Sequence, residues 1–302
     1  MLSDDVIEKY MKAGRIASCI KKRLRGIVKP GVKYVEIADF VEKTIIEMGG
    51  IPAFPCNISL ASEAAHYTPF HGDHKTVPDY GVLKIDFGVC IDGYLSDTAV
   101  SIDLSGEHED LIKAAEEALD KAIEVIKPGI KVSEIGEVIE KTIKSYGANP
   151  IRNLTGHNLE RYRLHAGLSI PNTRVWGGGR IREGMAVAIE PFATKGIGYV
   201  VDSKTITIYS ISKPLTKVHK LGVKEAEELY KIIYNERKEL PFTERWYTRY
   251  MSIDKIRSTI EKMYKKKILT GYPVLVEASG GQVAQAEDSI IVLRGEIIVY
   301  TR

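Results

Sequence analysis

The chain has 302 residues, of which 44% are hydrophobic and 27% charged. This composition is typical of a globular protein with a large buried core and excludes a disordered chain. The 43 basic and 40 acidic residues give a formal net charge of +3, so the surface should be mixed in sign and does not favour nucleic acid as the obvious partner. A run of one sign, Lys265–Lys267, is interpreted as a solvated helix end, with contact to ribosomal or other RNA as the alternative.

The cysteines and the N-terminal segment indicate a cellular compartment. Cys19, Cys56 and Cys90 are odd in number, widely spaced and without a CxxC pair, so neither a disulfide framework nor a thiolate zinc site is indicated. The N-terminal segment is charged throughout, and no window of the sequence approaches the roughly 18 apolar residues of a membrane span. We therefore expect a soluble protein of the reducing cytoplasm, with no membrane contact.

An internal repeat predicts the organisation of the chain. The segment PGVKYVEIADFVEKTIIEMGGIP at residues 30–52 matches PGIKVSEIGEVIEKTIKSYGANP at residues 128–150 without a gap, with about half of the aligned positions identical. Each copy begins with a Pro-Gly turn, continues with apolar residues at helical spacing and ends at glycine. Charged helical segments precede the copies at residues 8–28 and 109–126, and strand-rich sequence follows each copy. The chain therefore consists of two helix-helix-sheet halves.

The two halves are expected to share one core. Their helices and sheets must bury apolar faces, and the simplest arrangement is a sheet platform with the helices outside it and a functional site between the halves. Two independent domains would need a flexible linker near residue 105, where the sequence DLSGEHEDLI is only a short turn. We predict a single α+β domain over residues 1–302.

A helical pattern interrupts the second half. After the strand-like TITIYSI at residues 205–211, charged helical patterns cover residues 223–239 and 253–267, and strands resume at VLVEA. This pattern is typical of a helical insertion. Its aromatic residues Trp246, Tyr247 and Tyr250 are expected to pack the insertion onto the platform, with a ligand-binding aromatic box as the alternative.

Two aspartates flank a predicted hairpin. The Asp-Gly dipeptide at residues 92–93 lies between strand-forming runs and favours a two-residue turn. Counting outward from this turn places Asp86 opposite Ala99 and Asp97 opposite Gly88. The two aspartates then share a sheet face as diagonal neighbours, about 7 Å apart. Two like charges buried together need cations, whereas the alternative is a pair of ordinary surface and turn aspartates.

Three further residues lie beside apolar sequence. His157 lies in NLTGHNL, Glu190 in MAVAIEPF and Glu287 in VAQAEDSIIV. A carboxylate in an apolar strand needs a strong partner, which is either a metal ion or a buried ion pair. With the two aspartates they supply four carboxylates and one imidazole. This set suits two Mn, Fe, Co or Zn ions and does not suit a thiolate structural zinc.

The chain resembles the archaeal type II methionine aminopeptidases over essentially its whole length. The motifs that carry the resemblance are AAHYTP around His66, KIDFG around Asp86, SDTA around Asp97, GHNLERYRLHAG around His157 and His165, AIEPF around Glu190 and QAEDSI around Glu287. The resemblance implies a pseudo-twofold "pita-bread" fold, with a type II helical insertion at residues 215–270. It also implies removal of the initiator methionine from nascent proteins and peptides by hydrolysis at a dinuclear metal centre.

The same resemblance implies a role for each site residue. The implied ligands of the two divalent metal ions are Asp86, Asp97, His157, Glu190 and Glu287, with Asp97 and Glu287 bridging the ions. His66 and His165 carry over as catalytic, substrate-contacting histidines that bind no metal, and we expect Glu190 also to act as the general base. The residues that match the family's methionine pocket, unless they are plain core residues, are Phe54, Leu164, Phe192 and Tyr272.

Two rival functions remain at this point. An Xaa-Pro aminopeptidase or prolidase of the same fold shares the five-ligand scheme, but the insertion and the HAG sequence around His165 argue against it. A non-catalytic relative that binds RNA or ribosomes has no reason to retain a complete ligand set. The sequence does not determine which ion binds or which second substrate residue is preferred. From the resemblance we expect a monomer, and we leave room for transient ribosome contact.

Overall fold

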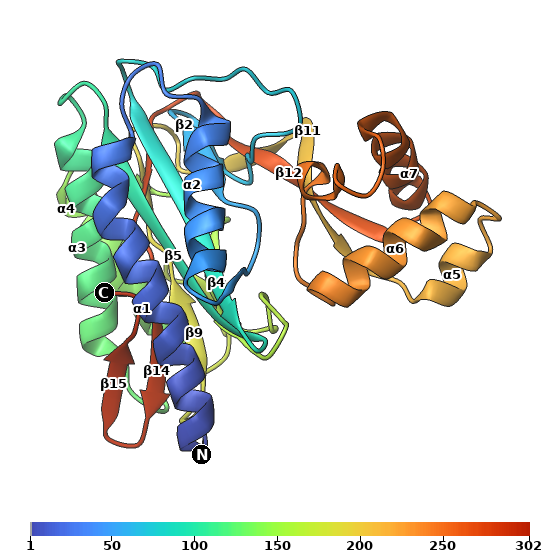
Figure 1. Cartoon of the computed structure of the whole chain (residues 1–302). Coiled ribbons are helices and arrows are strands. Elements are labelled where there is room, and N and C mark those ends of the chain that lie inside the picture. The colour runs from blue at the N-terminus through green and yellow to red at the C-terminus, as the bar shows by residue number, and fades with distance from the viewer. Residues whose placement is uncertain (1) are drawn as a thin grey trace.

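The chain forms two successive groups of helices and strands that share one plan (Figure 1). The computed structural model describes residues 2–302. The first half contains α1 (Asp4–Ile27), α2 (Tyr34–Glu47), β1 (Ile51–Pro52), β2 (Asn57–Leu60), β3 (Glu63–Ala65), β4 (Val82–Ile91) and β5 (Tyr94–Asp103). The second half begins with α3 (Glu109–Val125), α4 (Val132–Ser145), β6 (Asn149–Pro150), β7 (Thr155–Leu159), β8 (Ser169–Pro171), β9 (Ala186–Ile189), β10 (Phe192–Thr194) and β11 (Val200–Ile211).

The second half continues through a helical segment before its last strands. The helices are α5 (Leu215–His219), α6 (Lys224–Arg237), the short 3₁₀ helix η1 (Glu244–Tyr247) and α7 (Ile253–Lys265). The closing strands are β12 (Leu269–Glu277), β13 (Val283–Gln285), β14 (Asp288–Leu293) and β15 (Glu296–Val299). The predicted helices and strands are all present, and α1 starts earlier than expected because Ser3 caps it by accepting from the backbone N–H of Val6.

Both repeat copies start their helix in the same way. The turns before α2 and α4 contain Gly31 and Gly129, with φ of 88° and 92°, a left-handed conformation that favours glycine. In the first turn of each helix a glutamate, Glu36 or Glu134, accepts at 3.3 Å from the backbone N–H of the lysine that precedes the helix. The sequence repeat therefore corresponds to a repeated local structure.

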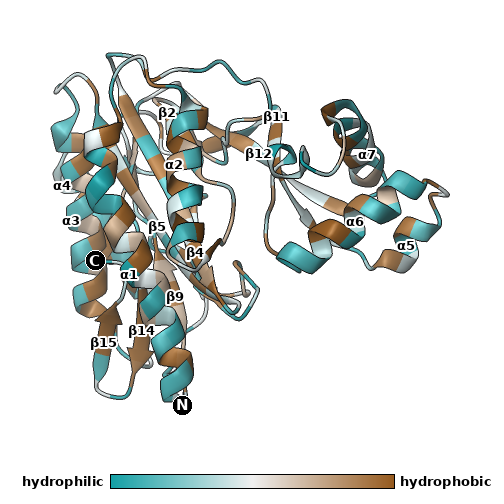
Figure 2. Cartoon of the chain, viewed as in Figure 1, coloured by the Kyte–Doolittle hydropathy of each residue, from teal (hydrophilic) through white to brown (hydrophobic). Residues whose placement is uncertain are grey.

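Helices α1 to α4 cover the strands from outside (Figure 1). One core cluster joins Ile20 of α1 to Phe87 of β4, and a second joins Ile139 of α4 to Ile290 of β14. Figure 2 shows the strands as mostly hydrophobic, whereas the covering helices carry hydrophilic residues on their outer sides. Burial of these apolar stripes holds the helices on the platform, which is the layered α+β arrangement that the sequence predicts.

The strands of the two halves meet at the centre of the molecule. Within residues 2–302 the sheets have the orders β1-β4-β2 with β5 paired to β4, β13-β10-β6, β11-β12-β3 and β15-β14-β9-β7-β8. A further bridge pairs Ala99 of β5 with Glu287, between β13 and β14. The segment that carries Asp97 in the first half therefore lies against the segment that carries Glu287 in the second.

The predicted hairpin register is confirmed. Strands β4 and β5 pair Asp86 with Ala99 and Gly88 with Asp97, and the turn residues Asp92 and Gly93 have φ of 50° and 88°. Both values are positive, as a type I′ turn requires. The two aspartates therefore lie on one face of the hairpin, as the alternation of side chains along a strand dictates.

The helical segment has a core of its own and touches the platform through its aromatic residues. Strands β11 and β12 pair with each other and lead to helices α5 to α7 at one side of the molecule (Figure 1). Tyr247 is fully buried in this core, and the Trp246 indole donates at 2.7 Å to Glu42 of α2. The interpretation that these residues pack the segment onto the platform is therefore confirmed for Trp246, whereas Tyr247 lies in the segment's own core and Tyr250 is half-exposed and hydrogen-bonds Glu236.

The helices and the cysteines can be compared with the expectations about membrane spans and disulfides. No helix within residues 2–302 has the length and apolar character that crossing a membrane requires. Cys19, Cys56 and Cys90 are free thiols in this part of the chain, in line with the expectation that no disulfide framework exists.

Two glycines of α1 provide a matched test of the packing between the N- and C-terminal ends. A Cβ on Gly14 would lie 1.7 Å from the backbone oxygen of Tyr300, whereas nothing lies within 4 Å of a Cβ on Gly26. We expect Gly14→Ala to lower the free energy of unfolding by about 3 kcal/mol, because backbone cannot move aside cheaply. Gly26→Ala should raise it by up to about 1 kcal/mol through helix propensity. Urea denaturation measures both, and equal effects would contradict this packing.

Candidate metal centre and substrate pocket

The five side chains that the sequence predicts as metal ligands reach one cavity from both halves of the molecule. Asp86 and Asp97 come from β4 and β5, and His157 comes from β7. Glu190 directly follows β9, and Glu287 lies between β13 and β14. The cavity has a volume of about 380 Å³ and all five residues line it. The repeat thus places the candidate site at the junction of the two halves, as expected from the layered arrangement.

The side-chain atoms are spaced as ligands around a shared point. His157 Nε2 lies 3.5 Å from Asp97 Oδ2 and 3.6 Å from Glu190 Oε1. Ligand atoms of Asp97, His157 and Glu287 all lie within 4.8 Å of one another. Two atoms that each bind an ion at about 2.1 Å lie roughly 3 to 4 Å apart, so these separations fit metal coordination.

The electrostatics of the cavity also favour cations. Burial raises the pKa of Asp86 to about 7. Burial first, and then the neighbouring carboxylates, raise the pKa values of Asp97, Glu190 and Glu287 well above their usual range. Burial lowers the pKa of His157, and the His165 ring adds to this effect, so the imidazole is neutral and available as a ligand. The cluster therefore binds protons or metal ions to offset its own charge.

Unpaired buried atoms support the same fit. Within residues 2–302, Asp86 Oδ1 and His157 Nδ1 are buried without a hydrogen-bond partner. The five side chains that the sequence assigns to the ions offer oxygen and nitrogen and no sulfur. This donor chemistry fits divalent Mn, Fe, Co or Zn, and the identity of the ions stays open.

Two amides that the sequence analysis did not identify orient the carboxylates. Asn57 Nδ2 donates to Asp86 Oδ2 at 3.3 Å, and Gln285 Nε2 donates to Glu287 Oε2 at 3.2 Å. Such outer partners fix the orientation of metal ligands. Gln285 belongs to the QAEDSI motif and was identifiable from it. Asn57 has no such signal, because its position opposite Asp86 depends on the pairing of β2 with β4.

The same cavity has an apolar side. The four residues assigned to the methionine pocket line it: Phe54, Leu164, Phe192 and Tyr272. Phe54 packs over Gly88, where an added Cβ would lie 2.7 Å from its ring, so this glycine in the KIDFG motif makes room for the pocket wall. Further walls that the sequence did not reveal come from Leu154, Leu168, Ile208 and Pro241.

His66 and His165, the two site histidines that the sequence does not assign to the ions, line the same cavity. His66 has a positive φ of 69°, a strained conformation that is typical of functional sites, and its Nδ1 donates at 3.2 Å to the carbonyl of Pro273. The ring of His165 lies 4.4 Å from that of His157. Desolvation lowers the pKa of His66 and of His165, so both rings are neutral at pH 7. The cavity therefore holds every residue that the sequence assigned to the site, while their individual roles stay predictions.

The affinity of this site for metal ions should fall as the pH falls. The folded-state pKa of Asp86 is raised from 3.8 to about 7. In the metal-free protein, the contribution of Asp86 to the free energy of unfolding is therefore most favourable at low pH and is lost as the pH rises through about 7. Metal ions displace the protons, so from pH 8 to pH 6 the affinity should fall about 10-fold through Asp86 alone. We expect added Mn or Co to raise the unfolding temperature more at pH 8 than at pH 6, reversibly with chelator. Equal shifts at both pH values would contradict the arrangement.

Comparison with known proteins identifies the family. The family model for metallopeptidase family M24 matches residues 8–236. A methionine aminopeptidase of Saccharolobus solfataricus is 44% identical over 303 residues, which cover 100% of this chain and 99% of the relative. Two solved structures share the fold: a thermophilic Arx1 (TM-score 0.86, 18% identity, 99% and 91% of the chains) and methionine aminopeptidase of Thermotoga maritima (TM-score 0.72, 21% identity, 100% and 98%). The resemblance predicted from the motifs is confirmed, and the chain belongs to metallopeptidase family M24.

Proposed function

We propose that the chain removes the N-terminal methionine from proteins and peptides by metal-dependent hydrolysis. The observation that carries this proposal is one cavity that combines a complete set of oxygen and nitrogen ligands with an apolar pocket. The ligands provide for hydrolysis and the pocket accepts an apolar first side chain. The names of the archaeal relatives point to the same reaction.

The proposed ligands of two divalent ions are Asp86, Asp97, His157, Glu190 and Glu287. When bound, such a pair supplies a water nucleophile at neutral pH and offsets the negative charge of the reacting carbonyl. Glu190 accepts a proton from the attacking water and passes it to the leaving amine.

The histidines act on the peptide itself. His66 contacts the scissile amide, and its Nδ1 bond to the Pro273 carbonyl leaves Nε2 as the unprotonated nitrogen of the neutral ring. His165 donates to the oxygen that becomes negative as the water attacks. Phe54, Leu164, Phe192 and Tyr272 surround the methionine side chain. The free N-terminal amine of the substrate would bind one of the two ions, which restricts the reaction to the first residue.

The wider organisation follows the same proposal. Residues 1–302 act as a single catalytic domain, in which residues 215–270 are the type II insertion. The chain works as a monomer that meets nascent polypeptides through transient ribosome contact, for which the exposed lysines at residues 265–267 offer a basic surface run. Light scattering that shows a concentration-independent dimer would contradict the monomer.

Peptide hydrolysis by metal-stripped protein tests the function. With Co or Mn added back, wild type should release methionine from Met-Ala-Ser, and Glu190→Ala should abolish release because both a ligand and the proposed base are lost. Cleavage of Xaa-Pro but not Met-Ala peptides would instead support a prolidase. Tight RNA binding without metal uptake would support a non-catalytic relative.

The role of His165 has its own test. His165→Ala should lower kcat by about 100-fold or more, because removal of one donor to the developing oxyanion typically has this effect. His219 on α5, which pairs with Glu227, is the matched control, and His219→Ala should leave kcat unchanged. A kcat within about threefold of wild type for His165→Ala would refute the oxyanion role.

A further inference from the structure

A buried arginine of the helical insertion reaches the wall of the substrate pocket. Arg237 is the last residue of α6, where Lys238 ends the helix with a positive φ of 56°. Only 4% of Arg237 is exposed. A single nitrogen, Nη2, donates to the carbonyls of Pro52 at 2.6 Å, Ala53 at 3.1 Å and Pro241 at 3.2 Å.

These three carbonyls belong to two separate walls of one pocket. Pro52 and Ala53 directly precede Phe54, and both Phe54 and Pro241 line the cavity. On its other side Ala53 is anchored to the platform, since its N–H donates at 2.8 Å to the carbonyl of Gly88. No other hydrogen bond in the described chain joins the 52–54 segment to Pro241. Arg237 therefore supplies the hydrogen bonds between the two walls, in addition to the packing of Leu240 in one hydrophobic cluster with Ala53 and Phe54.

The charge of Arg237 has no acidic partner. No carboxylate within residues 2–302 forms an ion pair with it, and its Nε is buried without a hydrogen bond. Its guanidinium stacks on the Trp246 ring at 4.8 Å, and burial lowers its pKa. A buried, unpaired cation is costly for the fold, so its position is not explained by a salt bridge that stabilises the insertion.

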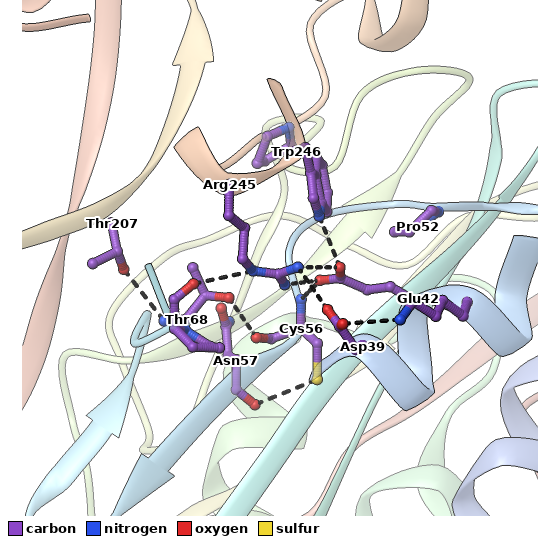
Figure 3. Close-up of polar contacts among 12 residues, drawn as sticks. Asp39, Glu42, Pro52, Cys56, Asn57, Thr68, Thr207, Arg245 and Trp246 are labelled. Carbon is purple, nitrogen blue, oxygen red and sulfur yellow. Dashed lines mark hydrogen bonds and ion pairs between the residues drawn. The ribbon is translucent and has the colours of Figure 1, made fainter. Parts of the chain in front are cut away.

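A neighbouring arginine serves as the contrast. Arg245 of η1 forms a two-pronged ion pair with the buried Glu42 of α2 (Figure 3). It also donates to the carbonyl of Pro69 at 3.1 Å. Glu42 also accepts from Trp246 and from the backbone N–H of Cys56. Arg245 thus attaches the insertion to the platform through an ion pair, whereas Arg237 bonds only to backbone carbonyls beside the pocket.

We propose that Arg237 is a positioning residue that sets the spacing between Phe54 and Pro241 and thereby the selectivity for methionine at the first substrate position. This inference rests on the proposed function of the pocket. Arg237 touches neither the carboxylates nor the catalytic histidines. Its loss should therefore weaken recognition of the substrate side chain and leave the chemical step intact.

The test compares three variants on Met-Ala-Ser and Leu-Ala-Ser with metal-loaded enzyme. Arg237→Met keeps an apolar stem and removes the hydrogen-bond donors. We expect this variant to have a KM for the methionine peptide about 10-fold above wild type and a kcat within about threefold of it. Its discrimination against the leucine peptide should fall. Arg237→Lys should restore both values, because one lysine nitrogen carries three N–H donors for the same three carbonyls. Arg249→Gln is the control, since Arg249 lines the same surface groove as Arg237 and pairs only with Glu236 in the described chain.

The outcomes separate this inference from the proposed function. Unchanged KM and discrimination in a folded Arg237→Met would overturn the role of Arg237, and so would an equal fall in kcat and kcat/KM without rescue by lysine. If Arg237→Met does not fold, Arg237→Gln decides by the same two readouts, because its shorter side chain carries only two N–H donors for the three carbonyls. A wild-type enzyme that releases no methionine would instead contradict the proposed function.

Discussion

Four carboxylates share one buried cavity, and their mutual repulsion is the constraint on which the rest of this structure depends. Burial raises the pKa of each, and the neighbouring carboxylates add to the effect for Asp97, Glu190 and Glu287. A fold that holds such groups together without bound cations must protonate them or lose stability. The site is therefore held by rigid strands and by the amides of Asn57 and Gln285, because flexible supports would let the charges separate.

The duplicated plan explains how a chain can build this site. Each half supplies a helix pair that covers its strands, and each presents the inner faces of those strands to the centre. The first half provides Asp86 and Asp97 on one hairpin, and the second provides the imidazole and two glutamates from strand ends. The bridge between Ala99 and Glu287 brings the two sets together. Neither half alone holds all five of the proposed ligands.

The helical insertion contributes to the cavity from a distance. It has its own hydrophobic core and reaches the platform through Arg245 and Trp246 at Glu42, and through Arg237 at the segment before Phe54. Pro241, which follows α6, lines the cavity beside residues of both halves. The insertion is therefore part of the pocket wall, and the apolar end of the site combines three parts of the chain.

Local patterns in the sequence determined the duplicated helices and the hairpin register of Asp86 and Asp97, whereas the two site histidines and the pocket residues were assigned through the motifs that resemble a known family. Turn chemistry, helical periodicity and strand alternation are short-range, so they can be read from neighbouring residues. The sequence could not predict the positions of Asn57, Pro241 and Arg237 at the site, because these positions depend on contacts with residues far away in the chain. Only the tertiary structure decided that both halves converge on one cavity and that Arg237 bonds to both pocket walls. The reason is that long-range packing brings together groups that no local pattern relates.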